Sequence, residues 1–365
     1  MSGGRQTPAT PTHGRVVPMH RLREADSASV GPKIARLAAL GAAGFPVPDG
    51  FAVTTGAWLE FIGTTGIGAR IDAWLGQAQA AGADVTLAEL EEVAARIRSE
   101  FDATALPPSM REDLVEAYDA LCFDVREVDK PVAVRSSAVG EDAADHSFAG
   151  QYETWLGVSG VDEVDLHLRR AWASLYSARA LDYRIRSGLE VRGTPMAVGV
   201  LELVRARAAG VAFSAHPLTG RSDRLVIEGS WGYGEAVVQG VVSPDHAELD
   251  REGLRVLDYR VGAKDTVSVM DYRRGAVLER PMPRAFRNAR VLDEDELDAI
   301  ARALIGVERH YGYPVDIEWV VPRGRRAGEP IVLVQARPIT TMAGARAELH
   351  WDAVEYALRY GARME

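Results

Sequence analysis

Cysteine, lysine and long apolar runs are all scarce in this chain of 365 residues, and each scarcity excludes a class of protein. A single cysteine, Cys122, rules out an internal disulfide and a metal site built from several cysteines. No apolar run approaches the ~20 residues of a membrane-spanning helix. The first residues lack the apolar core of a signal peptide. We therefore expect a cytoplasmic protein that does not bind a membrane.

Positive charge is also in short supply, because the formal net charge is −10. This balance argues against a general nucleic-acid surface, although a local basic pocket stays possible. Only three of the 42 basic residues are lysines, namely Lys33, Lys130 and Lys264. Since arginine serves wherever a generic cation suffices, a retained lysine is a candidate for a specific role, such as a compact charge on a phosphate.

The chain is long enough for two domains or two lobes, and 47% of its residues are hydrophobic. Helical spacing predicts a helix beginning at Lys33 after a Gly31-Pro32 turn, a helix capped by Ser109, and one long helix over 164–188. A short strand is expected over 131–134, followed by a polar loop over 135–145. The second half reads as mostly strands, and a final amphipathic helix is expected near the C-terminus.

The polar stretch after Val134 is the first candidate site, because Arg135 is followed closely by several small hydroxyl and acidic side chains. Neither a buried strand nor an ordinary surface loop needs this composition. It indicates that something polar and anionic is held there. Lys33 is the second candidate, since a cation at a helix N-terminus is unfavourable for the helix itself. The alternative for Lys33 is an ordinary solvent-exposed lysine.

The last two expected strands, "PVDIEWVV" and "PIVLVQARPIT", carry the sharpest signal. Strand alternation places Glu318 opposite Ile317 and Trp319, and puts Gln335 and Arg337 on one face, with Val334 and Ala336 pointing into the core. Paired antiparallel, the strands bring Glu318, Gln335 and Arg337 together. Carboxylate and amide oxygens suit Mg²⁺, and an adjacent arginine suits phosphate. The alternative is a structural Glu–Arg ion pair.

Read in order, these segments resemble a known family. The collinear motifs run from about Ser29 to Thr340 and read GxK…PVPxGFxVTT…VAVRSSAxxED…SFAGQxET…GVAFSxxPxTG…GxGExVVxGxVxPD…DIEW…QARPIT. They are similar to the N-terminal nucleotide-binding part of the PEP-utilising dikinases, which include phosphoenolpyruvate synthase, pyruvate phosphate dikinase and rifampin phosphotransferase. The resemblance implies an α+β ATP-grasp fold of two lobes with mixed or antiparallel sheets, flanking helices and the nucleotide between the lobes.

The resemblance also implies boundaries and roles. We expect a disordered lead-in over 1–15, lobes over 16–195 and 196–342, and a terminal helix over 343–365. The implied cofactors are ATP and Mg²⁺, with Glu318 and Gln335 as metal ligands and with Lys33, Arg135 and Arg337 as catalytic cations. The implied nucleotide contacts are Lys33, Arg135, Gly150, Thr154, Glu202, Leu203, Glu235 and Arg337. The roles of Glu235 and Lys264 stay open. Base selectivity also stays open, because this chain has Val200-Leu201-Glu202-Leu203-Val204 where many members have Val-Gln-x-Met-Val, so that adenine contacts there would need backbone groups and Glu202.

Complete members of that family form AMP and phosphate through a phosphorylated histidine in a Thr-Ser-His-type motif. None of the eight histidines here has that context. We therefore expect a separate histidine-bearing subunit that passes the phosphoryl group to a small hydroxyl or pyruvate-like acceptor, as in phenylphosphate synthase. The alternatives are a direct small-molecule kinase and a nucleotide-binding regulatory module without turnover.

Overall fold

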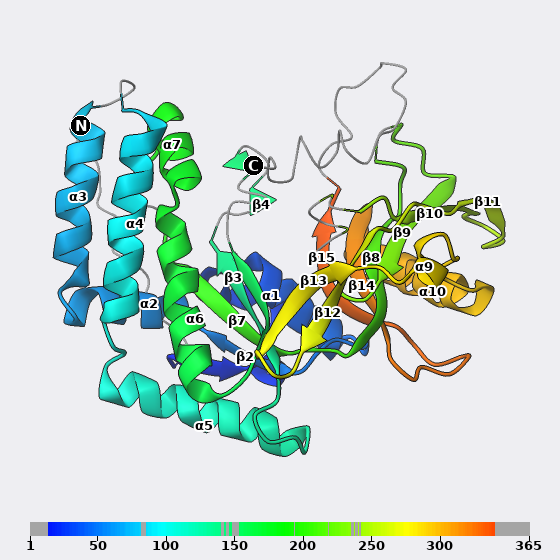
Figure 1. Ribbon diagram of the computed structural model, residues 1–365, viewed down its shortest axis with the longest axis horizontal. Coiled ribbons are helices and arrows are strands. Elements are labelled where there is room, and N and C mark those ends of the chain that lie inside the picture. Colours follow the sequence, from blue (N-terminus) through cyan, green and yellow to red (C-terminus); the bar gives the residue numbers. More distant parts are fainter. Residues whose placement is uncertain are drawn as a thin grey trace.

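The computed structural model describes residues 14–339 apart from 82–84, 140–141, 144–145, 148–152, 193, 218, 235–236, 238–239 and 241 (Figure 1). The expected disordered lead-in over 1–15 was too long, because Arg15 is ordered and pairs with Glu60 and Asp113, at 2.7 and 2.9 Å. The rest of that lead-in up to residue 13, the expected terminal helix, Gly150 and Glu235 lie outside the described residues. The protein is a mixed α and β structure with two main sheets, and the neighbouring strands within each sheet pair antiparallel. Among the described residues, no helix combines the length and the apolar character that a membrane span requires.

The first sheet has the strand order β1-β2-β7-β3-β6. Its strands are β1 (Val16–Pro18), β2 (Gly50–Val53), β3 (Val132–Ala138), β6 (Thr154–Val158) and β7 (Met196–Glu202). β7 comes last in the sequence and lies between β2 and β3 in space. The sheets therefore divide after Glu202, one strand beyond the boundary expected at 195/196. We call this sheet with its helices the first lobe.

The second sheet has the order β11-β10-β9-β8-β14-β15. Its strands are β8 (Ala206–Phe213), β9 (Arg224–Trp231), β10 (Asp245–Asp250), β11 (Val256–Arg260), β14 (Val315–Pro322) and β15 (Val332–Pro338). A separate hairpin of β12 (Thr266–Asp271) and β13 (Ala276–Pro281) reaches β6 of the first lobe (Figure 1). Two short strands, β4 (Asp142–Ala143) and β5 (His146–Ser147), pair with each other. We call the six-stranded sheet with its helices the second lobe.

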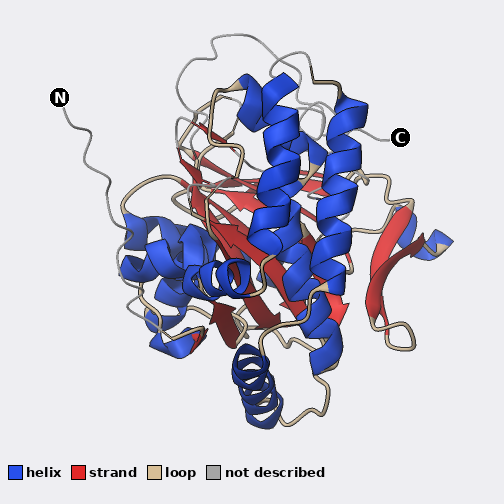
Figure 2. Ribbon diagram, turned by 90° about the vertical axis from the view of Figure 1, so that its left-hand side faces the viewer, coloured by secondary structure: helices blue, strands red, loops and turns tan. Residues whose placement is uncertain are grey.

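Helices cover the outer face of each sheet, and Figure 2 shows those of the first lobe in front of its strands. The first lobe has α2 (Thr55–Thr64), α3 (Ile67–Ala81), α4 (Leu87–Ala103), α5 (Pro108–Asp124), α6 (Val161–Ala173) and α7 (Ala178–Arg186). The second has α9 (Arg284–Arg287) and α10 (Glu294–Tyr311), and α10 buries its apolar face against β8, β9 and β14. Single 3-10 turns lie at Met19–Arg21, Glu24–Asp26 and Ser174–Tyr176.

The helix α1 (Ser27–Ala42) lies between the lobes. It packs against β3 and β7 on one side and against β15 on the other. Ile34 and Leu37 belong to an apolar cluster with strands of the first lobe. Leu40, one turn further on, belongs to the core of the second lobe. One helix thus contributes to both cores.

Several expected boundaries were wrong, and the structure shows the reason for each. α5 begins at Pro108, not at a Ser109 cap, because proline suits the first helical position, where no N–H partner is needed. The single long helix expected over 164–188 is broken at Ser177, whose side chain accepts a hydrogen bond from the Ala180 N–H and starts α7. Arg135 lies inside β3, since that strand is paired on both sides and continues to Ala138.

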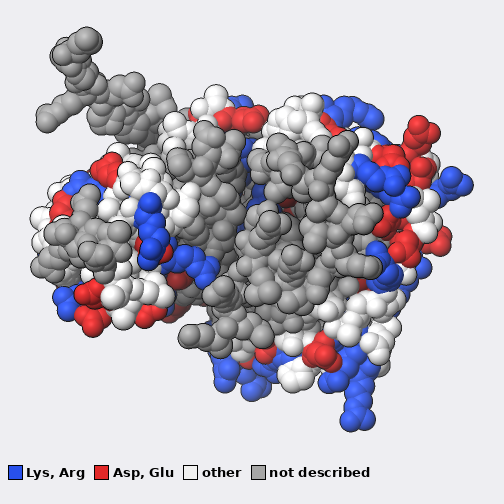
Figure 3. Space-filling view, turned by 90° about the horizontal axis from the view of Figure 1, so that it is seen from above, with Lys and Arg blue, Asp and Glu red and all other residues white. Residues whose placement is uncertain are grey.

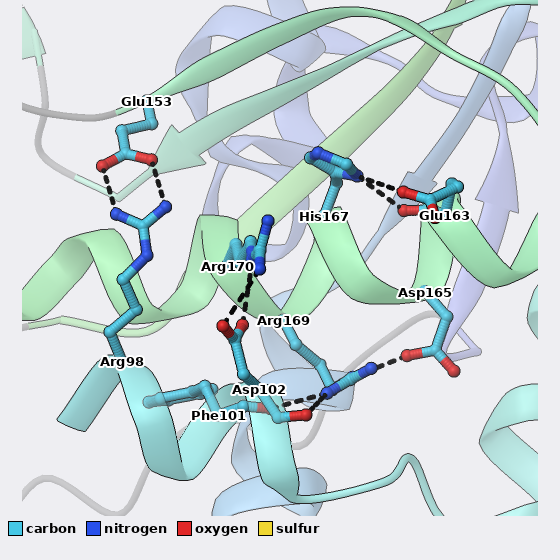
Figure 4. A network of polar contacts seen from close by, with 9 residues as sticks. All are labelled: Arg98, Phe101, Asp102, Glu153, Glu163, Asp165, His167, Arg169 and Arg170. Atoms are coloured by element: carbon cyan, nitrogen blue, oxygen red, sulfur yellow. Dashed lines mark hydrogen bonds and ion pairs between the residues drawn. The ribbon is translucent and has the colours of Figure 1, made fainter. Parts of the chain in front are cut away.

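Ion pairs join the outer helices of the first lobe, as Figure 4 shows. Arg169 on α6 donates to the carbonyl oxygens of Phe101 and Asp102 at the end of α4, at 2.7 and 2.8 Å. Arg170 donates to both carboxylate oxygens of Asp102, at 3.0 and 3.1 Å. Cations at a helix C-terminus satisfy its last carbonyls and favour its dipole. These contacts fix α4 against α6.

Charges of both signs are mixed on the described part of the face seen from above in Figure 3. Blue basic and red acidic side chains alternate there over short distances. A nucleic-acid surface would gather cations on one face or along one stripe. The described part of this face therefore carries no continuous basic stripe.

Candidate functional site

Arg135 joins the two lobes through its side chain. It lies in the middle of β3, and its guanidinium crosses to β14 and β15 of the second lobe. It donates to the Glu318 carboxylate at 3.1 Å, to the Gln335 amide oxygen at 3.0 Å and to the Val334 carbonyl at 2.8 Å. The exposed fractions of the Arg135 and Glu318 side chains are only 17% and 20%. A partly buried ion pair of this kind fixes the relative position of the two strands that carry it.

The strand register confirms that Glu318 and Gln335 are neighbours. They are direct partners in the β14–β15 ladder, and so face the same side of the sheet. The register then shifts, because Trp319 pairs with Leu333 and leaves Val334 without a partner. This bulge turns the Val334 carbonyl to Arg135. It also overturns the expectation that Val334 shares the core face of Ala336, since the two side chains pack into different apolar clusters.

Arg337 lies two residues along the same face and has a different carboxylate partner. It donates to both oxygens of Asp316, at 2.9 and 2.8 Å, and Asp316 is its direct partner in the ladder. Our sequence reasoning missed Asp316. The signal was present, because alternation places Asp316 and Glu318 on one face of β14. We call Arg135, Asp316, Glu318, Gln335 and Arg337 the interlobe cluster.

The donor set of the interlobe cluster fits Mg²⁺ in chemistry. Glu318 and Gln335 offer a carboxylate and an amide oxygen, which are hard ligands, and Asp316 lies beside them. Among the described residues, no group of three His, Cys, Asp or Glu side chains is arranged to hold a metal ion on its own. Such a site therefore suits a cation that takes its other ligands from water and from a bound phosphate.

Lys33 lies on the first turn after a kink in α1. Gly31 has φ +72° and ψ 158° there, and it separates two helical segments. A Cβ on Gly31 would lie 2.1 Å from the Ser137 carbonyl, two residues beyond Arg135. The N–H of Ile34 points to the Ser137 hydroxyl at 3.4 Å. α1 thus begins at Ser27, before the expected start at Lys33, but the predicted Gly-Pro turn is present as the kink and holds Lys33 beside β3.

The other predicted nucleotide residues are divided between two places. Thr154 is the ladder partner of Arg135 and is exposed, so it lies next to the interlobe cluster. Glu202 pairs with Val132 instead, three residues or about 10 Å along β3. Leu203 follows it in an apolar cluster with Tyr233 and Val320. The structure thus does not bring Glu202 and Leu203 to Arg135.

The backbone N–H groups of Glu202 and Leu203 are already paired. They donate to the carbonyls of Asp49 and Pro131, at 2.8 and 2.9 Å. Burial raises the pKa of the Glu202 carboxyl, and the nearby Lys130 ammonium opposes that rise. These two N–H groups are therefore not available to a nucleotide base. A base bound here would contact the Glu202 side chain and the apolar cluster of Leu203, Tyr233 and Val320.

Lys264 has a structural environment far from the interlobe cluster. Its ammonium is fully buried and pairs with Asp245, which also accepts from the Tyr259 hydroxyl at 2.6 Å and from the N–H groups of Gly262 and Val291, at 3.0 and 2.8 Å. Every partner of this carboxylate comes from the second lobe. Lys264 therefore ties loops to β10.

Comparison with known proteins identifies the family of the chain. Residues 27–355 match the family described as "Pyruvate phosphate dikinase, AMP/ATP-binding domain". The chain is 38% identical over 328 residues to a protein of Methanothermobacter thermautotrophicus named "Probable phosphoenolpyruvate synthase", covering 90% of this chain and 46% of that protein. It is 37% identical over 342 residues to the phosphoenolpyruvate synthase of Aeropyrum pernix, covering 87% of this chain and 41% of that protein.

The chain thus spans less than half the length of these curated relatives. The family match extends over most of the chain and contains all the residues of the interlobe cluster. The protein therefore belongs to the family of the AMP/ATP-binding domain of pyruvate phosphate dikinase.

Proposed function

We propose that this chain is the ATP-grasp part of a dikinase-type phosphotransferase, which binds Mg-ATP between its two lobes. The observation that carries the proposal is the meeting of Arg135 from the first lobe with Glu318 and Gln335 from the second. Binding of AMP or ATP is the property shared by the family. The triphosphate would lie at the interlobe cluster, and the base toward Leu203 and Glu202.

The cluster's present ion pairs suggest how the site accepts its ligand. Arg135 and Arg337 are held by Glu318 and Asp316. When Mg-ATP binds, the arginines would exchange these carboxylates for phosphate oxygens, and Glu318 and Gln335 would become free to hold the metal. A bound Mg²⁺ neutralises phosphate charge and orients the phosphate oxygens. The guanidiniums and Lys33 would stabilise the charge that moves during phosphoryl transfer.

The reaction we propose consumes ATP, water and a histidine, and yields AMP, phosphate and a phosphohistidine. The histidine would belong to a separate subunit, which passes the phosphoryl group to a hydroxyl or pyruvate-like acceptor. None of the eight histidines of the chain lies in a Thr-Ser-His motif.

Product analysis distinguishes the candidates. Calorimetry with ATP and Mg²⁺ should first show micromolar to millimolar binding, and no binding by a folded sample would contradict the whole proposal. With β-labelled ATP, a histidine-bearing subunit from a neighbouring gene and a hydroxyl acceptor, we expect AMP, phosphate and label on the partner's histidine. ADP as the product would indicate a direct small-molecule kinase instead. Binding with no product under any of these conditions would indicate a regulatory module.

A further inference from the structure

The strand β11 forms an open edge of the second sheet, at the right-hand side of Figure 1. The other three edge strands of the two main sheets have neighbours beyond their own sheet, since β1 lies against α5, β6 against β13 and β15 against α1. Among the described elements, only β10 packs against β11 to a comparable extent. Such an edge presents backbone N–H and C=O groups that another strand can bind.

Apolar side chains are exposed along this edge. The exposed fractions of Leu257 and Val261 are 49% and 45%, and Val256 is exposed as well. Three of the ten large apolar residues that are exposed in the described part of the chain therefore lie within six consecutive residues. Single exposed apolar side chains need no explanation, but a contiguous group of them is typical of a surface that a partner covers.

Two opposite charges lie on the same strand. Asp258 and Arg260 are two residues apart and so share a face, and the Arg260 Nε lies 2.9 Å from the Asp258 carboxylate. Their side chains are 49% and 64% exposed, so this pair is weak and both groups stay accessible. In the ladder with β10, Asp258 lies opposite another carboxylate, Glu248. A strand that placed a cation opposite Asp258 and an anion opposite Arg260 would therefore be favoured on the open side.

A second copy of β11, running antiparallel to the first, meets this requirement in one register. Residues whose N–H and C=O groups point outward alternate along a strand, and in an antiparallel pair they must face each other. The centre of a symmetric pair therefore falls on a residue. With Asp258 or Arg260 at the centre, like charges lie opposite each other, which is destabilising. With Tyr259 at the centre, Asp258 of each copy lies opposite Arg260 of the other. Leu257 then lies opposite Val261.

We propose that two copies of this chain associate through β11, antiparallel about a two-fold axis at Tyr259, and so join their six-stranded sheets into one. Because the interface is symmetric, each favourable charge pair and each apolar pair occurs twice. Tyr259 at the axis is held by its own chain, since its hydroxyl donates to Asp245 at 2.6 Å. β11 and β15 are opposite edges of the sheet, so the association leaves the interlobe cluster open. This inference goes beyond the proposed function and does not depend on it.

Sedimentation velocity of the whole chain over a range of concentrations tests the proposal. We expect a reversible equilibrium between monomer and dimer. Asp258→Arg and Arg260→Asp each place like charges opposite each other, so each should weaken the dimer about tenfold or more. The double variant that carries both changes restores opposite charges and should restore the dimer. The matched control is Asp223→Arg, because Asp223 belongs to an exposed pair with Arg221 at the same spacing, outside β11. It should dimerise like the unmodified protein.

Hydrogen exchange checks the location without any substitution. The N–H groups of residues 256–261 should exchange more slowly as the protein concentration rises. Asp258 and Arg260 are exposed, so we expect the variants to fold, which circular dichroism verifies. A monomer at every concentration would overturn the proposal, and so would capture of a different protein by β11 without any self-association. A dimer that persists in Asp258→Arg would place the interface elsewhere, and failure of the double variant to dimerise would exclude this register.

Discussion

The environments of the three lysines test the prediction, made from their scarcity, that each has a specific role. Two of them are buried side chains with a carboxylate partner: Lys130 with Glu127 at 3.2 Å, and Lys264 with Asp245. An ammonium is a compact point charge on a flexible stem, which suits pairing with a single enclosed carboxylate. The scarcity of lysine therefore indicated specific roles, but in these two cases the role is structural. Lys33 alone lies beside β3, and its contact with phosphate stays a prediction.

Because Glu318 pairs with Arg135 and is also a predicted metal ligand, one substitution there should change the affinities for Mg-free ATP and for Mg-ATP in opposite directions. Glu318→Gln releases Arg135, so Mg-free ATP should bind about fivefold more tightly, since a pair of this kind is worth about 1 kcal/mol. The same change removes a metal ligand, so Mg-ATP should bind more weakly and turnover should stop. Calorimetry with and without chelator measures both effects.

Glu228→Gln is the matched control, because Glu228 lies on the same face of the second sheet and pairs with His246 in place of an arginine. It removes one carboxylate from the same face of the sheet without touching a partner of Arg135. If both variants changed the affinity for Mg-free ATP equally, the effect would be general electrostatics, and the exchange of partners at Arg135 would be excluded.

Gly31 gives a second prediction. Its φ and ψ are open almost only to glycine, and a Cβ would meet the Ser137 carbonyl at 2.1 Å. Gly31→Ala should therefore lower the free energy of unfolding by more than about 3 kcal/mol. Gly44 also has positive φ, but its Cβ would meet nothing within 4 Å, so Gly44→Ala should cost about 1 kcal/mol. Urea unfolding measures both, and equal costs would show that the contact with β3 is unimportant.

Whole helices and strands were easier to predict than their ends. Periodicity predicted α5 and the helical character of α6 and α7, and alternation predicted the shared face of Glu318 and Gln335, because both patterns are local in sequence. The bulge at Val334 and the continuation of β3 through Arg135 depend on partners elsewhere in the chain, whereas the break at Ser177 is a local helix cap that the sequence analysis missed. The Glu318 partner of Arg135 is 183 residues away. No local pattern could have supplied that contact.

The junction of α4 and α6 predicts a pH effect. The hydrogen bonds from Arg170 lower the pKa of the Asp102 carboxyl below its usual value of about 3.9. A lowered carboxyl pKa stabilises the fold above that usual value, and the stabilisation is lost as the pH falls through the folded-state pKa. Asp102→Asn should therefore be less stable than the unmodified protein at about pH 7, and this difference should shrink toward about pH 3.

Urea titrations at the two pH values measure that difference. Asp119→Asn, on the exposed side of α5, is the control for general loss of negative charge. A difference that stayed constant over the whole pH range would mean that the Arg170 contact contributes nothing to the stability of the native state.

The two lobes are coupled through α1, so we expect them to unfold together. Leu40 lies in the second core, the Tyr311 hydroxyl donates to the Arg36 carbonyl at 3.3 Å, and the Leu333 N–H donates to the Pro46 carbonyl at 2.8 Å. Circular dichroism and tryptophan fluorescence of the whole chain should follow one transition in urea. A fragment of residues 14–204 should expose Leu40 and bind a hydrophobic dye, and adding residues 205–339 should reduce that binding. Two separate transitions would show independent lobes.

The position of α1 also bears on how the protein forms on the ribosome. Synthesis delivers α1 early, whereas the strand β15 against which it packs emerges nearly 300 residues later. At about 5–20 residues per second, the far side of this helix waits tens of seconds for its partner. During that interval Leu40 and its neighbours are apolar surface available to other chains or to chaperones. Slow, late closure of the second lobe is the expected kinetic consequence, because contacts of large sequence separation form last.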